Sequence, residues 1–164
     1  MLCGSGWLKM RSFGIDFGTT NSCVVAIGDD GEPRTIPKGA PLPSVVWYRG
    51  GGIEVGAEAK KQLGNAEILP QSRVFQSVKR LVWSGDGKLA LHSGTVQVVD
   101  VAAQVFSKLR ALVKQEFPGE DMTEAVLTVP VGFESEQRRA LRKAAEIAGI
   151  SIRTFIHEPF AAVL

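Results

Sequence analysis

The fold of this protein is decided by residues 13–27, which read FGIDFGTTNSCVVAI. Two apolar segments enclose a short polar centre, and this pattern predicts two strands joined by a tight turn. Asp16 lies at the end of the first predicted strand, and the turn that follows consists of Gly18, Thr19, Thr20 and Asn21. Hydroxyls, an amide and free backbone N–H groups in such a turn can form an anion-binding concavity for phosphate oxygens. A nearby carboxylate can hold Mg²⁺ directly or through water.

This turn is not a Walker A loop, which requires Gly-x-x-x-x-Gly-Lys-Ser/Thr before a helix. On these residues alone, a phosphate-binding turn and a plain Gly/Thr/Asn hairpin are equally well supported, because short motifs match many unrelated proteins. The triple glycine at residues 50–52 raises the same question. It lies between two short predicted strands, with Arg49 before it and no Ser or Thr after it, so a hairpin turn is favoured over a phosphate loop.

Composition limits the classes of protein to consider. The chain has 164 residues, 45% of them hydrophobic and 22% charged, as expected for one soluble globular domain. Its net charge of +2 is too small to indicate binding to nucleic acid or to an anionic membrane, and no apolar run reaches transmembrane length. Cys3 and Cys23 match no metal-binding spacing, and Cys23 is expected in the core. A reducing, cytoplasmic setting is therefore expected.

The remaining patterns predict strands first and then alternating helices and strands. A proline-rich extended stretch covers 33–43, strands are expected at 44–48 and 53–56, and two short strands are expected within 88–99. Short helices are expected at 57–63 and 72–83, and in the second of these Lys79 and Arg80 look like a solvated basic face. Asp100 is expected to cap a long helix that ends at Phe117. Then follow a strand at 124–129, a helix at 134–148, a strand at 151–156 and a helix that opens at Glu158. This order predicts an α/β fold in which helices pack on a mixed sheet.

Four segments, taken together, resemble an Hsp70-type chaperone. They are GIDFGTTNS at 14–22, VKRL at 78–81, AVLTVP at 125–130 with QRR at 137–139, and HEPFAA at 157–162. The resemblance is to the first lobe of the nucleotide-binding domain, an actin-like ATPase (ribonuclease H-like) lobe with a small outer subdomain. It implies an N-terminal extension over residues 1–12 and the first lobe over 13–164, with the chain truncated before the second lobe.

The resemblance implies a site for ATP or ADP and Mg²⁺ between two lobes, where water attacks the γ-phosphate. Asp16 would reach Mg²⁺ through water, and the phosphates would be contacted by Gly18, Thr19, Thr20 and Asn21. Lys79 would contact the γ-phosphate and the attacking water. Glu158 would lie near Mg²⁺ and that water. Phosphoryl transfer to water depends mainly on positioning and charge neutralisation, which these residue types supply.

Two further residues, Pro130 and Arg138, match positions that the family uses to relay the nucleotide state to its substrate-binding domain. The chain departs from the family pattern in this region, because Val131 and Gly132 stand where an Ala-Tyr pair is usual. His157 replaces a common Asn and is expected to be a packing or surface variant rather than a metal ligand. Phe160 replaces a common Thr, and the segment 85–99 is shorter than usual, so the outer subdomain is expected to be small.

The sequence contains no second phosphate loop of the Asp-Leu-Gly-Gly-Gly-Thr type and no adenosine-binding segments. The full-length protein is therefore expected to hydrolyse ATP and to work with cochaperones and unfolded client proteins, whereas this chain alone is expected to bind ATP weakly and to hydrolyse it negligibly. Two alternatives are an actin-like filament-forming cell-shape protein and a non-catalytic interaction module built on the lobe. The segments 42–46 and 79–81 favour the chaperone over the filament protein.

Overall fold

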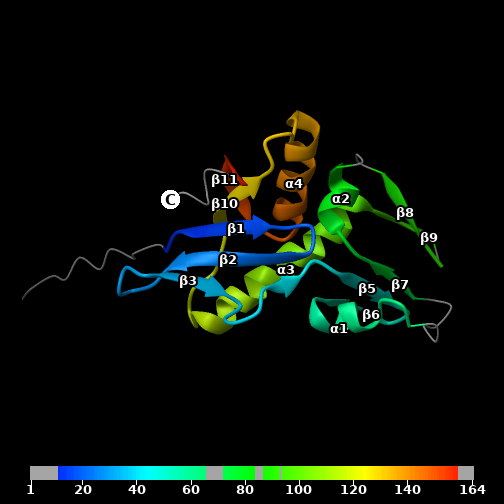
Figure 1. The fold of residues 1–164 in the computed structure, drawn as a ribbon, viewed down its shortest axis with the longest axis horizontal. Helices are drawn as coiled ribbons and strands as arrows, with labels where there is room; N and C mark the ends of the chain where they lie inside the picture. The colour runs from blue at the N-terminus through cyan, green and yellow to red at the C-terminus, as the bar shows by residue number, and fades with distance from the viewer. Residues whose placement is uncertain (1–10, 66–71, 84–86, 93, 159–164) are drawn as a thin grey trace, which may run out of the picture.

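The computed structural model describes residues 11–65, 72–83, 87–92 and 94–158 (Figure 1). Its elements, in chain order, are β1 (Phe13–Phe17), β2 (Asn21–Ile27), β3 (Pro33–Ile36), β4 (Leu42–Pro43), β5 (Val46–Arg49), β6 (Gly52–Val55), α1 (Ala57–Lys61), β7 (Arg73–Phe75), α2 (Val78–Trp83), β8 (Lys88–Leu91), β9 (Gly94–Gln97), α3 (Val98–Glu116), β10 (Glu124–Val129), α4 (Ser135–Ile147) and β11 (Ser151–His157). The helix expected beyond Glu158 lies outside the described residues.

The central element is a mixed sheet with the order β11-β10-β1-β2-β3, and β4 pairs with β2. The strands β1, β10 and β11 are mutually parallel, whereas β2 runs antiparallel to both β1 and β3. A three-stranded sheet (β6-β5-β7) and the β8–β9 hairpin lie beyond the β1–β2 turn, on the right of Figure 1. The predicted mixed α/β architecture is therefore confirmed.

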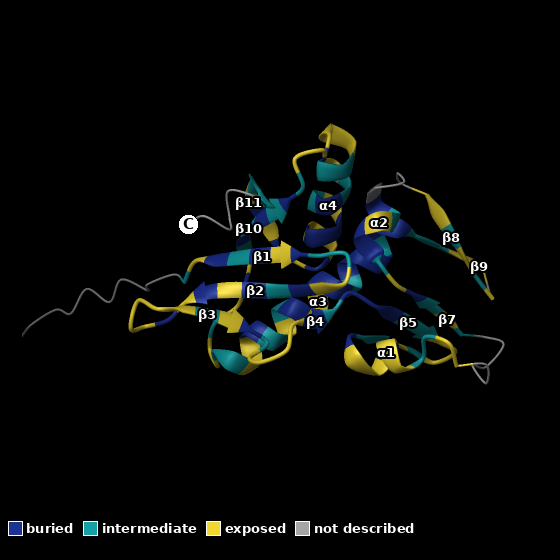
Figure 2. Cartoon of the chain, in the orientation of Figure 1, coloured by how far each residue is buried: buried dark blue, intermediate teal, exposed yellow. Residues whose placement is uncertain are grey.

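The core lies between the central sheet and the helices α3 and α4, which also pack against each other. Alternate residues of β1 face this core, so Phe13, Ile15 and Phe17 are buried while Asp16 is exposed (Figure 2). The ring of Phe17 stacks on that of Phe106 in α3, with ring centroids 5.0 Å apart. This period-two burial fixes the register of β1, because a one-residue slip would expose the whole apolar set.

The long helix was predicted almost correctly, but Asp100 is not its cap. Helix α3 begins at Val98, and its N-cap residue is Gln97, which makes no side-chain capping hydrogen bond. Val98 and Val99 are both buried and belong to the helix rather than to a strand. Burial of these two side chains in the core extends the helix towards its N-terminus, and Asp100 lies in the first turn, where a carboxylate favours the helix dipole.

The helix predicted over residues 72–83 is wrong in its first half. Arg73–Phe75 forms strand β7, in which Phe75 pairs with Val46 and Val74 with Trp47 of β5. A β-branched and an aromatic residue suit this half-buried position at the edge of the small sheet. Ser77 has a φ of 53°, a left-handed conformation that separates β7 from α2.

Three other local predictions are confirmed: the hairpin turn at the triple glycine, the helix at 134–148 and the two short strands within 88–99. The β5–β6 pair is an antiparallel hairpin that pairs Arg49 with Gly52, so the triple glycine forms its turn. Helix α4 has Glu134 as N-cap in a capping box with Gln137. Gly149 follows this helix with a φ of 74°, as a C-terminal stop requires. The β8–β9 pair was also expected.

Cys23 was expected in the core, but the structure places it elsewhere. In β2 the buried residues are Ser22, Val24 and Ala26, and Cys23 lies on the other face, where it is half-buried. It is a free cysteine paired in register with Asp16. Burial, and secondarily the charge of Asp16, raise the pKa of the Cys23 thiol.

No helix among the described residues is long and apolar enough to cross a bilayer.

Candidate functional site

The predicted site residues gather at one edge of the central sheet. Since β1, β10 and β11 are parallel, their carboxyl ends meet at this edge, where open α/β sheets commonly bind ligands. Asp16 in β1 pairs with Thr128 in β10, which in turn pairs with Ile156 in β11. Glu158 directly follows β11. At this edge the end of β1 therefore lies two strand spacings, about 10 Å, from the end of β11.

The carboxylate of Asp16 is oriented by a neighbour that the sequence analysis missed. Thr128 donates a hydrogen bond from its hydroxyl to Oδ1 of Asp16 at 3.0 Å. Oδ2 of Asp16 receives no hydrogen bond from the described residues, and the side chain is exposed at the sheet edge. The carboxylate is thus held by one oxygen and presents the other outward.

The β1–β2 turn is tight, and only glycine fits its first position. A Cβ atom on Gly18 would lie 2.1 Å from the carbonyl oxygen of Asn21. Thr19 is half-buried, whereas Thr20 and Asn21 are exposed. Among the described residues, the backbone N–H groups of Thr19 and Thr20 find no hydrogen-bond acceptor. The turn therefore offers the polar groups that a phosphate-binding concavity needs.

Lys79 is buried, contrary to the interpretation of Lys79 and Arg80 as a solvated basic face. Its side chain is 7% exposed and its ammonium forms an ion pair with Glu158, whose side chain is 42% exposed. Arg80, the next residue, is exposed. The Lys79 ammonium also lies 5.8 Å from the centroid of the Phe133 ring. A buried ammonium is costly unless it is paired, so Lys79 depends on Glu158. The ion pair also joins α2 to the end of β11.

Pro130 and Arg138 lie in one contact chain that leads away from Lys79. Pro130 follows β10, and its carbonyl accepts a hydrogen bond from the N–H of Phe133 at 3.1 Å. The carbonyl of Phe133 accepts a hydrogen bond from Nε of Arg138 at 3.1 Å. The Arg138 guanidinium lies 6.0 Å from the ring centroid of Phe155 in β11. Phe133 thus contacts both Pro130 and Arg138, although no sequence pattern pointed to it.

The chemistry of these donors fits Mg²⁺ held mainly by water and phosphate. Within the described ranges, no three His, Cys, Asp or Glu side chains are grouped so as to bind a metal ion. Mg²⁺ keeps several waters and is usually bound through one or two carboxylates together with substrate phosphates. Asp16 supplies one such carboxylate. His157 belongs to no metal-binding group of the described chain, and its Nδ1 is buried without a hydrogen-bond partner there.

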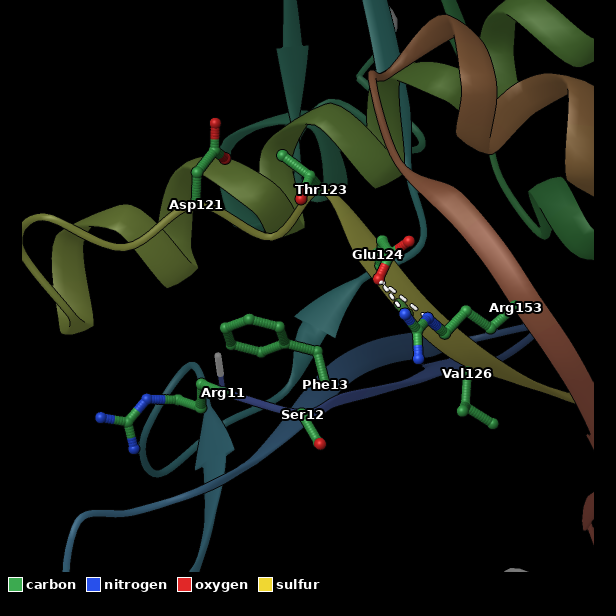
Figure 3. Close-up of a pocket in the computed structure, with 9 residues that line it drawn as sticks. Arg11, Ser12, Phe13, Asp121, Thr123, Glu124, Val126 and Arg153 are labelled. Atoms are coloured by element: carbon green, nitrogen blue, oxygen red, sulfur yellow. Dashed lines mark hydrogen bonds and ion pairs between the residues drawn. The ribbon is translucent and has the colours of Figure 1, made fainter. Parts of the chain in front are cut away.

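A separate hollow of about 250 Å³ lies at the opposite edge of the sheet (Figure 3). It is lined by residues from the starts of β1 and β10 and by Arg153 of β11. Its charged groups are already paired, since Arg153 donates to Glu124 at 2.8 Å and Arg11 is bound to Glu120 and Asp29. We find no unpartnered charge in this hollow that would call for a ligand.

Comparison with protein families identifies the family of the chain. The model of the family described as Hsp70 protein matches residues 12–86 and 84–164, nearly the whole chain. The matched residues include both strands around the turn, α2 with Lys79, and the β10–α4–β11 unit. This match, together with the mixed α/β sheet, identifies the structure as an actin-like ATPase fold. The chain belongs to the Hsp70 family of chaperone ATPases.

Proposed function

We propose that this chain forms one wall of the Mg-ATP site of a cytoplasmic Hsp70-type chaperone, which couples ATP hydrolysis to the folding of client proteins with the help of cochaperones. The observation that carries the proposal is the ion pair between the buried Lys79 and the half-exposed Glu158, which lies at the same sheet edge as Asp16 and the β1–β2 turn. The free thiol of Cys23 is compatible with a reducing compartment.

In this proposal the turn residues Gly18, Thr19, Thr20 and Asn21 contact phosphate oxygens. Asp16 holds Mg²⁺ through water, and the ion supplies charge neutralisation for the phosphates. The hydrogen bond from Thr128 supports this assignment, because it limits the rotation of the Asp16 carboxylate while one oxygen stays outward. The exposed hydroxyl and amide of Thr20 and Asn21 support the phosphate contact.

Lys79 and Glu158 are proposed to act at the γ-phosphate. Lys79 is already desolvated, so its ammonium interacts strongly with any anion that reaches it. A γ-phosphate at the sheet edge would compete with Glu158 for the ammonium. Glu158, whose side chain is 42% exposed, would then be free to orient the attacking water.

Pro130 and Arg138 are proposed to relay the nucleotide state. Both contact Phe133, whose ring faces the Lys79 ammonium. A shift of Lys79 towards phosphate would alter this contact first. The change would then reach Arg138 through the Phe133 carbonyl and pass to Phe155 in β11.

The proposal is tested by titrating the ¹⁵N-labelled chain with Mg-ATP and following the amide chemical shifts. We expect weak binding, with shifts concentrated at Thr19, Thr20 and Asn21 and around Lys79. Mg-AMP, which lacks the β- and γ-phosphates, is the matched control and should leave these amides unmoved. Asp16→Ala should abolish the Mg²⁺-dependent part of the response. Equal shifts with Mg-AMP, or no shift in the turn at any Mg-ATP concentration, would contradict the proposal.

Calorimetry and a turnover assay complete the test. Little heat and negligible ATP hydrolysis are expected from this chain alone, because the sequence lacks the second phosphate loop. A micromolar affinity, near −8 kcal/mol, lost in Asp16→Ala would show that one lobe, or a dimer of lobes, completes a working site. Turnover that depends on Asp16 would refute the expectation that a second wall is needed.

A further inference from the structure

Ser44, between β4 and β5, holds the β1–β2 turn with three hydrogen bonds. Its backbone N–H donates to the carbonyl of Thr20 at 2.8 Å. Its hydroxyl donates to the carbonyl of Gly18 at 2.8 Å and lies 2.9 Å from the hydroxyl of Ser22. Ser44 and Ser22 are 0% and 1% exposed. Neither serine can touch a ligand directly.

The direction of the two hydroxyl hydrogen bonds is determined by counting hydrogens. A serine hydroxyl carries a single hydrogen and can accept through its lone pairs. The Ser44 hydroxyl uses its hydrogen for the carbonyl of Gly18, because a carbonyl oxygen can only accept. Ser22 must therefore donate to Ser44. The two hydroxyls form a directed chain that ends on the turn, and each bond in such a chain polarises the next.

These bonds also set the direction of the turn's N–H groups. In a planar trans peptide the C=O and N–H groups point in opposite directions. Because Ser44 binds the carbonyls of Gly18 and Thr20, the N–H groups of Thr19 and Asn21, which share those peptides, point away from Ser44. Ser44 thus sets the direction of the Thr19 N–H, which finds no acceptor among the described residues, and of the Asn21 N–H at the other end of the turn.

We infer that Ser44, supported by Ser22, is a positioning residue that orients the backbone donors of the β1–β2 turn for phosphate. This inference rests on the proposed function and deepens it by adding a buried pair to the phosphate site. Both neighbours of Ser44 in the chain are held in place. The preceding residue Pro43 pairs with Asn21 in β2, and the carbonyl of the following residue Val45 accepts a hydrogen bond from Gly56 at 3.0 Å.

The experiment compares Ser44→Ala with Val24→Ala in the ¹⁵N-labelled chain. Val24 is a matched control, because it is fully buried in the same strand β2 but makes no hydrogen bond to the turn. Residual dipolar couplings report the orientation of each N–H vector without ligand, and a Mg-ATP titration reports affinity at the turn. Ser44→Ala should change the couplings of Thr19 and Asn21 and weaken Mg-ATP binding about tenfold. Val24→Ala should leave the couplings of Thr19 and Asn21 and the Mg-ATP affinity unchanged, once the affinity is corrected for the folded fraction.

Two further variants keep the test decisive. Ser44→Thr retains the hydroxyl, so its couplings and its Mg-ATP affinity should match those of the unmodified chain. Ser22→Ala removes only the supporting donor, so it should give a smaller change of the same kind and replaces Ser44→Ala if that variant does not fold.

Unchanged couplings in Ser44→Ala, or changed couplings with unaltered Mg-ATP affinity, would overturn the inference. If the unmodified chain shows no Mg-ATP response, the proposed function fails. The couplings then still decide whether Ser44 orients the turn.

Discussion

Lys79 and Arg80 are neighbours in α2, yet one side chain is buried and the other residue is exposed. The sequence alone does not separate them, because both are basic residues on a short helix. The tertiary contacts separate them, since Glu158 and Phe133 both approach the Lys79 ammonium. A buried ammonium with a half-exposed partner is an asymmetric pair, and removal of each partner has a different consequence.

We predict that Glu158→Gln destabilises the protein by about 1–3 kcal/mol, because it leaves a buried ammonium without its counter-ion. Lys79→Met should leave the free energy of unfolding unchanged or slightly higher, since Glu158 can be solvated when alone. Urea denaturation of both variants measures the difference. Arg80→Met serves as the control for the loss of a basic residue in α2. Equal destabilisation by Glu158→Gln and Lys79→Met would show that the ammonium is not effectively buried.

Tyr48 is the only tyrosine of the chain, so its ionisation can be followed without interference. Burial, and secondarily the charge of Asp100, raise the pKa of Tyr48 to about 12. In the unfolded chain the phenol ionises near the ordinary pKa of about 10. The folded protein therefore retains this proton longer, and its stability should fall as pH rises from about 10 to about 12.

Ultraviolet absorption at alkaline pH checks this prediction. Phenolate absorbance should appear only at a pH well above the ordinary pKa of about 10, together with the loss of folded structure seen by circular dichroism. In Tyr48→Phe this part of the pH dependence should be absent. A phenolate signal at the ordinary pKa in a folded protein would show that Tyr48 is open to solvent.

At the scale of elements, the β1–β2 turn depends on the lack of a side chain at its first position. We predict that Gly18→Ala costs about 2–4 kcal/mol, because its Cβ would lie 2.1 Å from a backbone oxygen and the turn would have to open. Gly51→Ala is the matched control, since nothing lies within 4 Å of a Cβ there, and it should change stability by less than about 0.5 kcal/mol. Thermal unfolding of the two variants compares them directly. A similar loss in both would mean that glycine is not required by the close approach to Asn21.

Elements with long periodic patterns were predictable from the sequence. The long helix α3, the helix α4 and the strands β1 and β10 were all expected, and the structure contains each of them. The errors fall on short segments. The three residues of β7 were predicted as helix, because Val74 and Phe75 suit either state and only pairing with β5 decides. Cys23 was expected in the core because an apolar residue in a strand does not reveal which face is covered.

The candidate site was predictable in part for the same reason. Asp16 and the turn belong to one local motif, so their proximity follows from the hairpin alone. Thr128, Phe133 and Ser44 were missed, because their contacts join elements that are distant in sequence. Thr128 depends on the parallel pairing of β1 with β10, Phe133 on the packing of α2 near the segment after β10, and Ser44 on the path of the chain after β4. None of these features has a local sequence signal.

At the scale of the whole molecule, Arg110 connects parts of the chain that are distant in sequence. From α3 its Nε and Nη2 donate to the carboxylate of Asp121, each at 2.7 Å, and Nη1 donates to the carbonyl of Ala148 at 2.8 Å. This links the end of α4 to the segment before β10, at the side of the sheet away from Asp16. Arg110 thus adds a polar link to the packing of α3 against α4.

Asp121 makes this link sensitive to acid. The hydrogen bonds from Arg110, and then that from Lys114, lower the pKa of Asp121 to about 2, whereas an unfolded aspartate titrates near about 3.9. Since the folded-state value is the lower one, the stabilisation is present above about pH 4 and is lost as the pH falls towards 2. Because the pair is partly exposed to solvent, we expect about 1 kcal/mol rather than the full value that the shift implies.

Asp121→Asn should therefore lower the free energy of unfolding by about 1 kcal/mol at pH 7, and the difference from the unmodified protein should vanish near pH 2. Urea denaturation at a series of pH values measures this convergence. Asp30→Asn is a suitable control, because Asp30 also pairs with an arginine, Arg34, but this pair is local and exposed, between the turn before β3 and β3 itself. If Asp121→Asn and Asp30→Asn lost equal stability at pH 7, the bridge between α3 and α4 would have no special role. A larger loss in Asp121→Asn would show that the link works across the molecule, because only Asp121 holds the arginine that also binds the end of α4.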